Sequence, residues 1–140
     1  MKIKTLIRFM IFGLLLAGCA TKTPAATTAP SSSALFQIVK PDGSAFDVTL
    51  SAVKALPLAQ LTVEGKVQEG PKLKDVLALA GITEFTTVDI AGSSSPATLT
   101  FAQVDDNTIL DFNNHGTMKL ATTYISMPNW TKDVSKITVK

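Results

Sequence analysis

The single cysteine of the 140-residue chain, Cys19, limits how the rest of the sequence can fold. It follows a short positive segment, Met1–Arg8, and an apolar stretch, Phe9–Leu16. A basic start followed by such a run is the layout of a secretory signal peptide, and the run is too short to span a bilayer as a helix. The chain after Cys19 can form no internal disulfide, so its fold must rest on a hydrophobic core, which a domain of this length can build.

The residues around the cysteine form a recognisable motif. Leu16-Ala17-Gly18-Cys19 closely matches the bacterial lipobox. In proteins with that motif a peptidase cuts before the cysteine, whose thiolate takes up a diacylglycerol. We therefore predict a signal peptide over residues 1–18 and lipidation at Cys19, with an ordinary signal peptide and a chance cysteine as the alternative. Ala20, in place of the Asp that usually favours the inner membrane, favours the periplasmic side of the outer membrane if the cell is Gram-negative.

A segment rich in Thr, Ala, Pro and Ser follows the cysteine. Such a composition buries too little apolar surface to fold. We interpret residues 19–33 as the lipidated cysteine and a flexible tether, and residues 34–140 as one folded domain.

The formal charge of the chain, +2, depends on its first residues. Without Lys2, Lys4 and Arg8, 10 Lys and Arg face 11 Asp and Glu, a formal charge near −1. No positive surplus remains to neutralise phosphates, which excludes a basic nucleic-acid-binding domain. The expected partners are the membrane, through the N-terminal lipid, and a small molecule or protein of the cell envelope.

Alternating and β-branched segments predict many short strands in the domain. Gly65 is expected at a bulge or turn within one of them, and Gly92–Pro96 forms a flexible loop. The predicted strands are Leu35–Val39, Phe46–Leu50, Leu61–Val67, Glu84–Ala91, Thr98–Thr100, Thr108–Phe112, Lys119–Ser126 and Lys136–Val139.

Two short helices and one helical turn are predicted between these strands. Ser51 can cap a helix over Ala52–Leu56, and Thr100 can cap a single turn over Phe101–Val104. The clearest helix opens at Pro71 and ends before Gly81. Its apolar stripe consists of Leu73, Val76, Leu77 and Ala80. Many short strands with two or three short helices predict an α+β domain with mixed, mostly antiparallel sheets.

The order of these segments resembles the sulfite-oxidase-like, molybdopterin-binding oxidoreductase domain family. Val48–Ile82 has the family's strand, short helix ending in Leu-Pro, strand, Gly and leucine-rich helix ending in Ala-Gly. Ile109–Val139 has its polar turn, basic strand and closing Trp-x-Lys-x-Val-x-x-Ile-x-Val pattern. The resemblance covers about Phe46–Lys140. It implies a mixed α+β fold with coiled antiparallel sheets and a pterin-cofactor site made from loops at one end.

The chain departs from the family at the positions that carry its chemistry. The family's enzymes bind molybdenum through a cysteine between the Leu-Pro element and the leucine-rich helix, and Leu58–Pro71 contains none. Arg8, in the signal segment, is the chain's only arginine, so the domain lacks the fork that suits bidentate phosphate binding. We expect no catalytic residues and no cysteine-ligated molybdenum. A molybdopterin cofactor is implied by the resemblance alone.

Six residues are candidates for ligand binding. Asn113-Asn114-His115-Gly116 is a dense polar cluster that could hold a polar ligand, although Asn and Gly are also what a tight turn between strands demands. Lys119 and Lys132 could supply positive charge to a pocket, or could be strand-face lysines. His115 could be a base or a metal ligand, but an exposed turn histidine is the better interpretation.

Other polar and aromatic groups have simpler explanations. Asp105-Asp106-Asn107 with Asp111 could bind calcium, but the spacing is not that of an EF-hand and a solvated turn is favoured, so no metal site is predicted. Trp130 and Tyr124 could form a stacking wall, with a core position favoured for Trp130.

These observations support three hypotheses. The leading one is a lipid-anchored, extracytoplasmic domain that binds a ligand or protein without catalysis. The second is a molybdopterin-binding subunit or accessory of a redox enzyme. The third is a structural envelope lipoprotein.

Overall fold

The structure, a computed structural model, describes residues 34–140. The predicted signal peptide, the lipidated Cys19 and the tether over residues 19–33 lie outside the described residues. Within the described part of the chain, no helix combines the length and the apolarity needed to cross a membrane.

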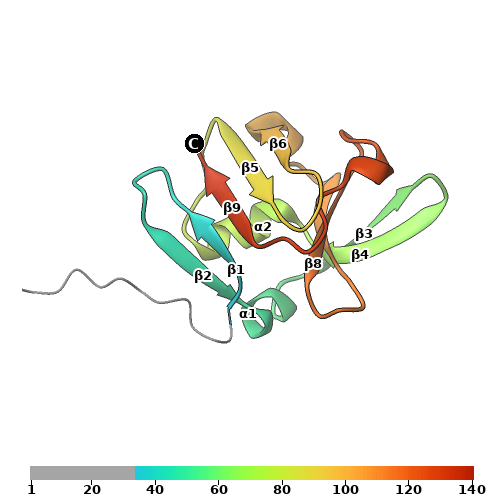
Figure 1. Cartoon of the computed structure of the whole chain (residues 1–140), viewed down its shortest axis with the longest axis horizontal. Helices are drawn as coiled ribbons and strands as arrows, with labels where there is room; N and C mark the ends of the chain where they lie inside the picture. Colours follow the sequence, from blue (N-terminus) through green and yellow to red (C-terminus); the bar gives the residue numbers. More distant parts are fainter. Residues whose placement is uncertain (1–33) are drawn as a thin grey trace, which may run out of the picture.

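A five-stranded sheet forms one half of the domain (Figure 1), in the order β2-β1-β9-β5-β6. These strands are β1 (Ala34–Val39), β2 (Ala45–Thr49), β5 (Thr87–Ala91), β6 (Ala97–Thr100) and β9 (Lys136–Val139). β1 and β9 are parallel, and the other neighbours are antiparallel. The last strand of the chain therefore lies at the centre of the sheet, where it joins the first hairpin to the β5–β6 pair.

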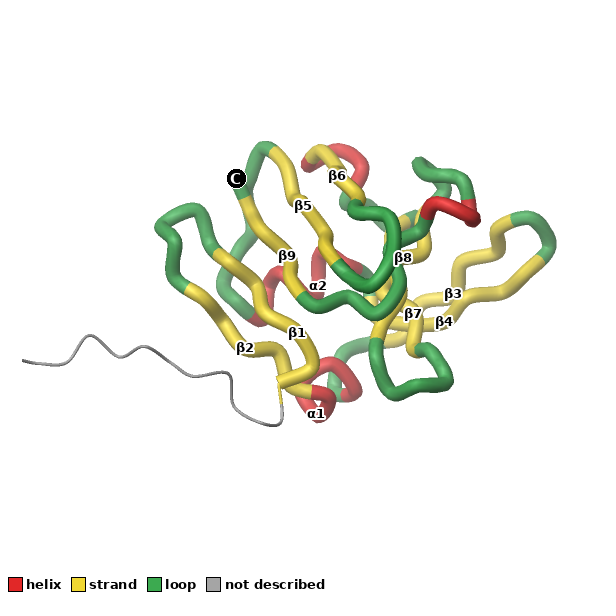
Figure 2. Tube along the Cα trace, in the orientation of Figure 1, coloured by secondary structure: helices red, strands yellow, loops and turns green. Residues whose placement is uncertain are grey.

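Two hairpins form the other half of the domain. β3 (Leu58–Val63) pairs with β4 (Lys66–Pro71), and β7 (Thr108–Phe112) pairs with β8 (Met118–Thr122). A single bridge, Lys72 to Ile109, links the segment after β4 to β7. The tube view in Figure 2 shows the β3–β4 hairpin extending away from the five-stranded sheet.

The predicted strand over Leu61–Val67 is wrong in extent, because the chain turns back within it. Glu64 and Gly65 both have positive φ, 52° and 76°, the combination of a two-residue type I′ hairpin turn. The turn expected at Gly65 is confirmed, but it ends β3 at Val63 and starts β4 at Lys66.

Both helices begin elsewhere than expected. α1 (Leu50–Lys54) is capped by Thr49 and not by Ser51, because the Thr49 hydroxyl accepts the Ala52 backbone N–H at 3.2 Å. α2 (Leu73–Leu79) begins after Pro71, which instead ends β4 opposite Leu58. Proline is tolerated at a strand end where its missing N–H faces away from the paired strand.

Two further strands differ from the prediction by more than one residue. β5 begins at Thr87 and not at Glu84, while β8 begins at Met118 and ends at Thr122. The chain leaves β8 early because it curls around an indole: the Trp130 N–H is shared by the carbonyls of Thr122 and Ile125, at 3.0 and 2.9 Å. A 3-10 turn, η2 (Met127–Asn129), lies within that curl. The helical turn predicted after Thr100 is present as η1 (Phe101–Gln103).

The domain has two separate apolar clusters. The larger cluster packs the five-stranded sheet against α2 and includes Ile38, Leu77 and Ile137. The smaller cluster lies between the two hairpins and consists of Leu61, Ile109, Ala121 and Trp130. The core position predicted for Trp130 is confirmed, since 2% of the residue is exposed. The predicted α+β class with mostly antiparallel sheets is also confirmed.

Candidate functional site

A groove of about 450 Å³ opens where the smaller cluster meets the surface. Three segments distant in sequence form it: the β3–β4 hairpin, strand β8, and the stretch that begins with η2 and runs to Lys132. We call it the lysine groove. Its lining residues are Glu64, Lys66, Gln68, Lys119, Met127, Pro128, Trp130 and Lys132.

Lys119 is held in place on several sides. Its Nζ lies 2.9 Å from Asp111 Oδ2 and donates to Gln68 Oε1 at 2.8 Å. The two charged side chains are 26% and 15% exposed, so water screens this ion pair less than a surface pair. The same Nζ lies 5.8 Å from the centroid of the Trp130 ring, within cation–π range. The groove therefore contains one ammonium group at a defined position.

Trp130 forms a rigid part of the wall beneath that ammonium. Its indole N–H is satisfied by two backbone carbonyls and its ring belongs to the smaller core cluster. A buried tryptophan with its N–H paired has little freedom to rotate. The position of the ring is thus set by the fold and does not depend on a ligand.

Two further lysines line the groove. Lys66 comes from β4 at the tip of the hairpin, and Lys132 from the segment after Trp130; both residues are exposed. Among residues 34–140, no carboxylate lies within ion-pair distance of either ammonium. Glu64 adds one carboxylate to the lining and Asp111 pairs with Lys119, so three lysines at the groove face two carboxylates. Its chemistry favours an anionic occupant.

The backbone of Lys132 is fixed by the loop after β5. Its N–H donates to Ser94 Oγ at 2.9 Å, and its carbonyl accepts the Ser93 N–H at 2.8 Å. A Cβ on Gly92 would lie 2.1 Å from that carbonyl oxygen, so only glycine allows the two segments to approach. The loop over Gly92–Pro96, predicted to be flexible, is therefore held in place. The hydroxyls of Ser93 and Ser94 form hydrogen bonds with the segment that carries Lys132.

The Asn113-Asn114-His115-Gly116 cluster does not line the lysine groove. Asn113 Oδ1 accepts the backbone N–H groups of His115 and Thr117, both at 3.0 Å, and Gly116 has φ 75°. These contacts are those of a tight turn, the structural alternative considered for the cluster. Of the candidate residues, the structure brings Lys119 and Lys132 together, and it places Asn114 and His115 on the exposed turn.

Asp133 connects this turn to the loop after β5. Its Oδ1 accepts from Asn113 Nδ2 at 2.8 Å and from Thr117 Oγ1 at 2.5 Å, and its Oδ2 accepts from Ser93 Oγ at 2.5 Å. The hydrogen bonds from Ser93 and Thr117 are the main reasons that the pKa of Asp133 lies below its ordinary value. This network fixes the turn and the segment that carries Lys132.

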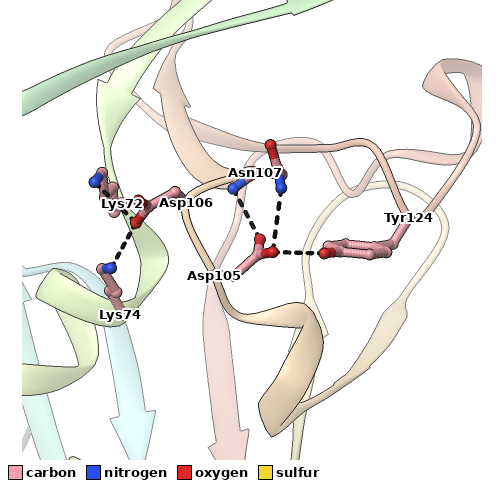
Figure 3. A network of polar contacts seen from close by, with 6 residues as sticks. All are labelled: Lys72, Lys74, Asp105, Asp106, Asn107 and Tyr124. Atoms are coloured by element: carbon pink, nitrogen blue, oxygen red, sulfur yellow. Dashed lines mark hydrogen bonds and ion pairs between the residues drawn. The ribbon is translucent and has the colours of Figure 1, made fainter.

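The acidic run at residues 105–107 is occupied by its own neighbours (Figure 3). Asp105 accepts from the Asn107 backbone N–H at 2.8 Å and from the Tyr124 hydroxyl at 2.6 Å. Burial is the largest single influence and raises the pKa of Asp105, but the hydrogen bonds from Tyr124 and Asn107 together outweigh it, so the pKa lies below its ordinary value. The solvated-turn interpretation is supported, and Tyr124 belongs to this network and not to the groove.

Asp106 points the other way, toward the start of α2. Its Oδ1 lies 2.9 Å from Lys72 Nζ and 2.5 Å from Lys74 Nζ. Hydrogen bonds from Lys72 and then Lys74 lower the pKa of Asp106 to about 2. Asp111, the remaining carboxylate of the proposed calcium set, pairs with Lys119 instead. Within residues 34–140, no group of three or more His, Cys, Asp or Glu is placed to hold a metal ion.

Five groove residues were not predicted from the sequence. Glu64, Lys66 and Gln68 lie on the hairpin, and Met127 and Pro128 lie in η2. The only sequence signal for the hairpin was Gly65 between two β-prone stretches. Nothing local indicates that its tip lies beside strand β8.

Comparisons with known proteins show a similarity of fold. No protein-family model matches the chain, and no curated protein matches it. The chain is similar to the crystal structure of the sulfane dehydrogenase SoxCD from Paracoccus pantotrophus, with a TM-score of 0.55 and 16% sequence identity. The match covers 74% of this chain and 37% of that chain, so the present chain spans well under half of its length. Identity this low shows a shared fold alone.

The residues present do not fit a thiolate-ligated molybdenum cofactor. The segment between β3 and α2 contains the Glu64-Gly65 turn and no cysteine. Since Cys19 and Arg8 are the only residues of their types in the chain, residues 34–140 contain neither thiol nor guanidinium. The groove offers ammonium, amide and carboxylate groups, which is a different donor set from the one that the family resemblance implies.

Proposed function

We propose that the domain is a non-catalytic binding module that holds a small organic anion in the lysine groove. The observation that carries this proposal is the placement of Lys119, whose ammonium is fixed by Asp111, Gln68 and Trp130 before any ligand arrives. A preorganised donor loses little entropy on binding, so it contributes more to affinity than a mobile lysine.

The arrangement of charges favours a ligand with more than one anionic group. Lys66 comes from β4, Lys119 from β8 and Lys132 from the segment after Trp130, so three separate segments each bring one ammonium to the groove. A volume of about 450 Å³ suits a small molecule and not a polymer. Di- and tricarboxylates and small phosphate esters meet both conditions, and Met127 and Pro128 offer apolar contact to a short carbon skeleton.

Titration calorimetry at low ionic strength tests the proposal, with citrate and inorganic phosphate as probes. We expect saturable binding of citrate that weakens about three- to tenfold in Lys132→Ala, the loss typical of one charge-assisted contact. Lys54→Ala is the matched control, because Lys54 is an exposed lysine at the end of α1, outside the groove. It should change the affinity less than about twofold, as expected for a distant screened charge.

Two results would count against the groove as a binding site. The first is equal loss of affinity in Lys132→Ala and Lys54→Ala, which would indicate attraction by overall charge alone. The second is the absence of saturable binding for both probes with the folded chain. Salt weakens anion binding whether the charge lies in the groove or elsewhere. The comparison of Lys132→Ala with Lys54→Ala therefore decides whether the anion binds in the groove.

The location is part of the proposal and rests on the sequence. We propose that the domain lies outside the cytoplasm on a lipid anchor at Cys19, on the periplasmic side of the outer membrane if the cell is Gram-negative. The support is the coincidence of a basic segment, an apolar stretch and Leu16-Ala17-Gly18-Cys19. A tether over residues 19–33 would let the groove face the surrounding solution.

A second candidate function is an accessory or cofactor-holding role for a redox enzyme. The fold similarity to a sulfane dehydrogenase chain and the sulfite-oxidase-like segment order favour it. The missing thiol speaks against molybdenum ligation by this domain. Pterin analysis of the protein purified from its native host separates the two functions, since a stoichiometric pterin would favour the second. A purely structural envelope role has less support, because a structural tether has no need of a preorganised ammonium.

A further inference from the structure

We infer that the free edge of strand β3 is a self-association surface, at which two copies of the chain pair antiparallel to form a continuous four-stranded sheet. This inference does not depend on the lysine groove or its ligand. It rests on the direction of the unpaired backbone groups, the absence of edge protection, and the position of two exposed apolar residues.

The turn sets which backbone groups of β3 face outward. A two-residue turn at Glu64-Gly65 closes on the Val63–Lys66 pair, so Val63 and every second residue before it bond to β4. The N–H and C=O groups of Leu58, Gln60 and Thr62 then point away from the hairpin.

The opposite edge of the hairpin confirms this alternation. Glu69 is the register partner of Gln60, and its backbone N–H points away from β3 to donate to Asp111 Oδ1 at 3.3 Å. The β4 edge is thus occupied by its neighbour. Across residues 34–140, no group accepts from or donates to the outward backbone groups of β3.

β3 also lacks the features that protect an edge strand from pairing. Its six residues, Leu58–Val63, include no charge and no proline. The edges of the five-stranded sheet differ: β2 carries Asp47, and β6 has four residues against six in β3. β3 is therefore less protected than either edge of the five-stranded sheet.

The register of the pair follows from the same alternation. Outward-facing residues must oppose one another, and a two-fold axis at Gln60 places Gln60 opposite its counterpart and Leu58 opposite Thr62 of the second copy. Leu58 and Val67 are 53% and 61% exposed, and Val67 is the partner of Thr62 within the hairpin. Pairing places Thr62 between Val67 and the second copy's Leu58 in one cross-strand row, so the Thr62 side chain can pack against both apolar neighbours.

A neutral strand suits a second copy better than a charged partner. Glu69, the nearest carboxylate on this face, is held by Gln60 Nε2 at 2.9 Å. In the proposed register the two Glu69 side chains are separated by both central strands, roughly 14 Å at the usual strand spacing. That separation exceeds the screening length at physiological salt, so like charges do not oppose the pairing.

Sedimentation equilibrium of the full chain in density-matched detergent tests the oligomeric state. We expect a dimer at micromolar concentration. Thr62→Pro should raise the dimer dissociation constant at least about tenfold, because it removes an outward N–H from each copy while leaving the ladder to β4 intact. Thr62→Ala keeps that N–H and should keep the dimer. A monomeric parent chain, or equal effects of the two variants, would overturn the inference.

A cross-linking test covers the case in which Thr62→Pro does not fold. Gln60→Cys should form an intermolecular disulfide under mild oxidation, because directly opposed residues of this type lie about 5.5 Å apart between Cα atoms, within the range that a disulfide spans. Thr62→Cys should not, since its counterpart lies four residues away along the strand, about 13 Å. The parent chain, which carries Cys19 alone, reports any background. Cross-linking of Thr62→Cys in preference to Gln60→Cys would refute this register.

Discussion

Lys119 and Asp111 face each other directly across the β7–β8 ladder, and their side chains meet with Nζ 2.9 Å from Oδ2. The same carboxylate reaches the other hairpin, where its Oδ1 accepts the Glu69 backbone N–H at 3.3 Å. The pair therefore joins the two hairpins and also positions the ammonium of the lysine groove. The fold and the proposed binding site share these two residues, so variants of each can test how much each contributes to stability.

Removing only one partner of this pair should cost more than removing both. Lys119→Met leaves the half-buried Asp111 carboxylate without its cation, and we expect a loss of about 1–3 kcal/mol in the free energy of unfolding. Asp111→Leu combined with Lys119→Met should recover part of that loss. Urea unfolding of the two single variants and the double variant measures the coupling. Strictly additive losses would show that the pair is not coupled.

Trp130→Phe should destabilise the domain by about 2–3 kcal/mol, because it leaves a space in the smaller core and frees the carbonyls of Thr122 and Ile125. Tyr124→Phe is the matched control. It also removes one aromatic hydrogen-bond donor, but Tyr124 is 42% exposed and its loss should cost less than about 1 kcal/mol. Chemical unfolding measures both, and equal losses would contradict a core role for Trp130.

Gly92→Ala should destabilise more strongly than a glycine change in open space. Its Cβ would lie 2.1 Å from the Lys132 carbonyl oxygen, so the segment that carries Lys132 must move. We expect a loss of about 2–4 kcal/mol, in the range of severe steric changes. Gly43→Ala meets no atom within 4 Å and suffers only the cost of φ 83°, about 1 kcal/mol. Thermal unfolding compares the two, and a smaller effect at Gly92 would contradict the close approach.

Asp106 should support stability at neutral pH and cease to do so in acid. Its pKa falls from 3.8 to about 2 in the folded chain, so its pairs with Lys72 and Lys74 contribute above pH 4 and are lost as the pH falls through about 2. The melting temperature of Asp106→Asn should lie below that of the parent chain at pH 7 and approach it near pH 2. Glu84→Gln, at an exposed carboxylate elsewhere, serves as the control. A difference independent of pH would contradict the ionic origin.

Cys19→Ser should abolish lipidation and leave the precursor unprocessed, because serine offers no thiolate to accept the diacylglycerol. Fractionation of the native host, with mass measurement of the product, detects both effects. Normal cleavage and membrane association of the variant would refute the lipobox interpretation and favour an ordinary signal peptide.

Local patterns predicted most elements but not their exact limits. The apolar stripe of Leu73, Val76 and Leu77 predicted α2, and all three residues are buried. Pro71 was assigned to that helix because proline often opens helices, but pairing with Leu58 draws it into β4. The limits of an element depend on which segment lies opposite, and that information is not local.

The candidate site shows the same division. Asp105, Asp106 and Asp111 are close in sequence, and the sequence favours a solvated turn for them over one shared calcium site. In the fold they serve three different partners: Tyr124, the lysines of α2, and Lys119. Side-chain direction along a strand or turn decides which of them can meet, so nearness in sequence was a poor guide.

The sequence by itself determined that no thiol or arginine lies in residues 34–140, that the domain is α+β, and that Trp130 belongs to a core. These properties follow from composition and from local apolar patterns. Only the tertiary structure decided where the site lies. Lys66, Lys119 and Lys132 come from separate segments, and they converge because Trp130 and Leu61 pack between two hairpins. Burial of that small apolar cluster joins segments that no local pattern connects.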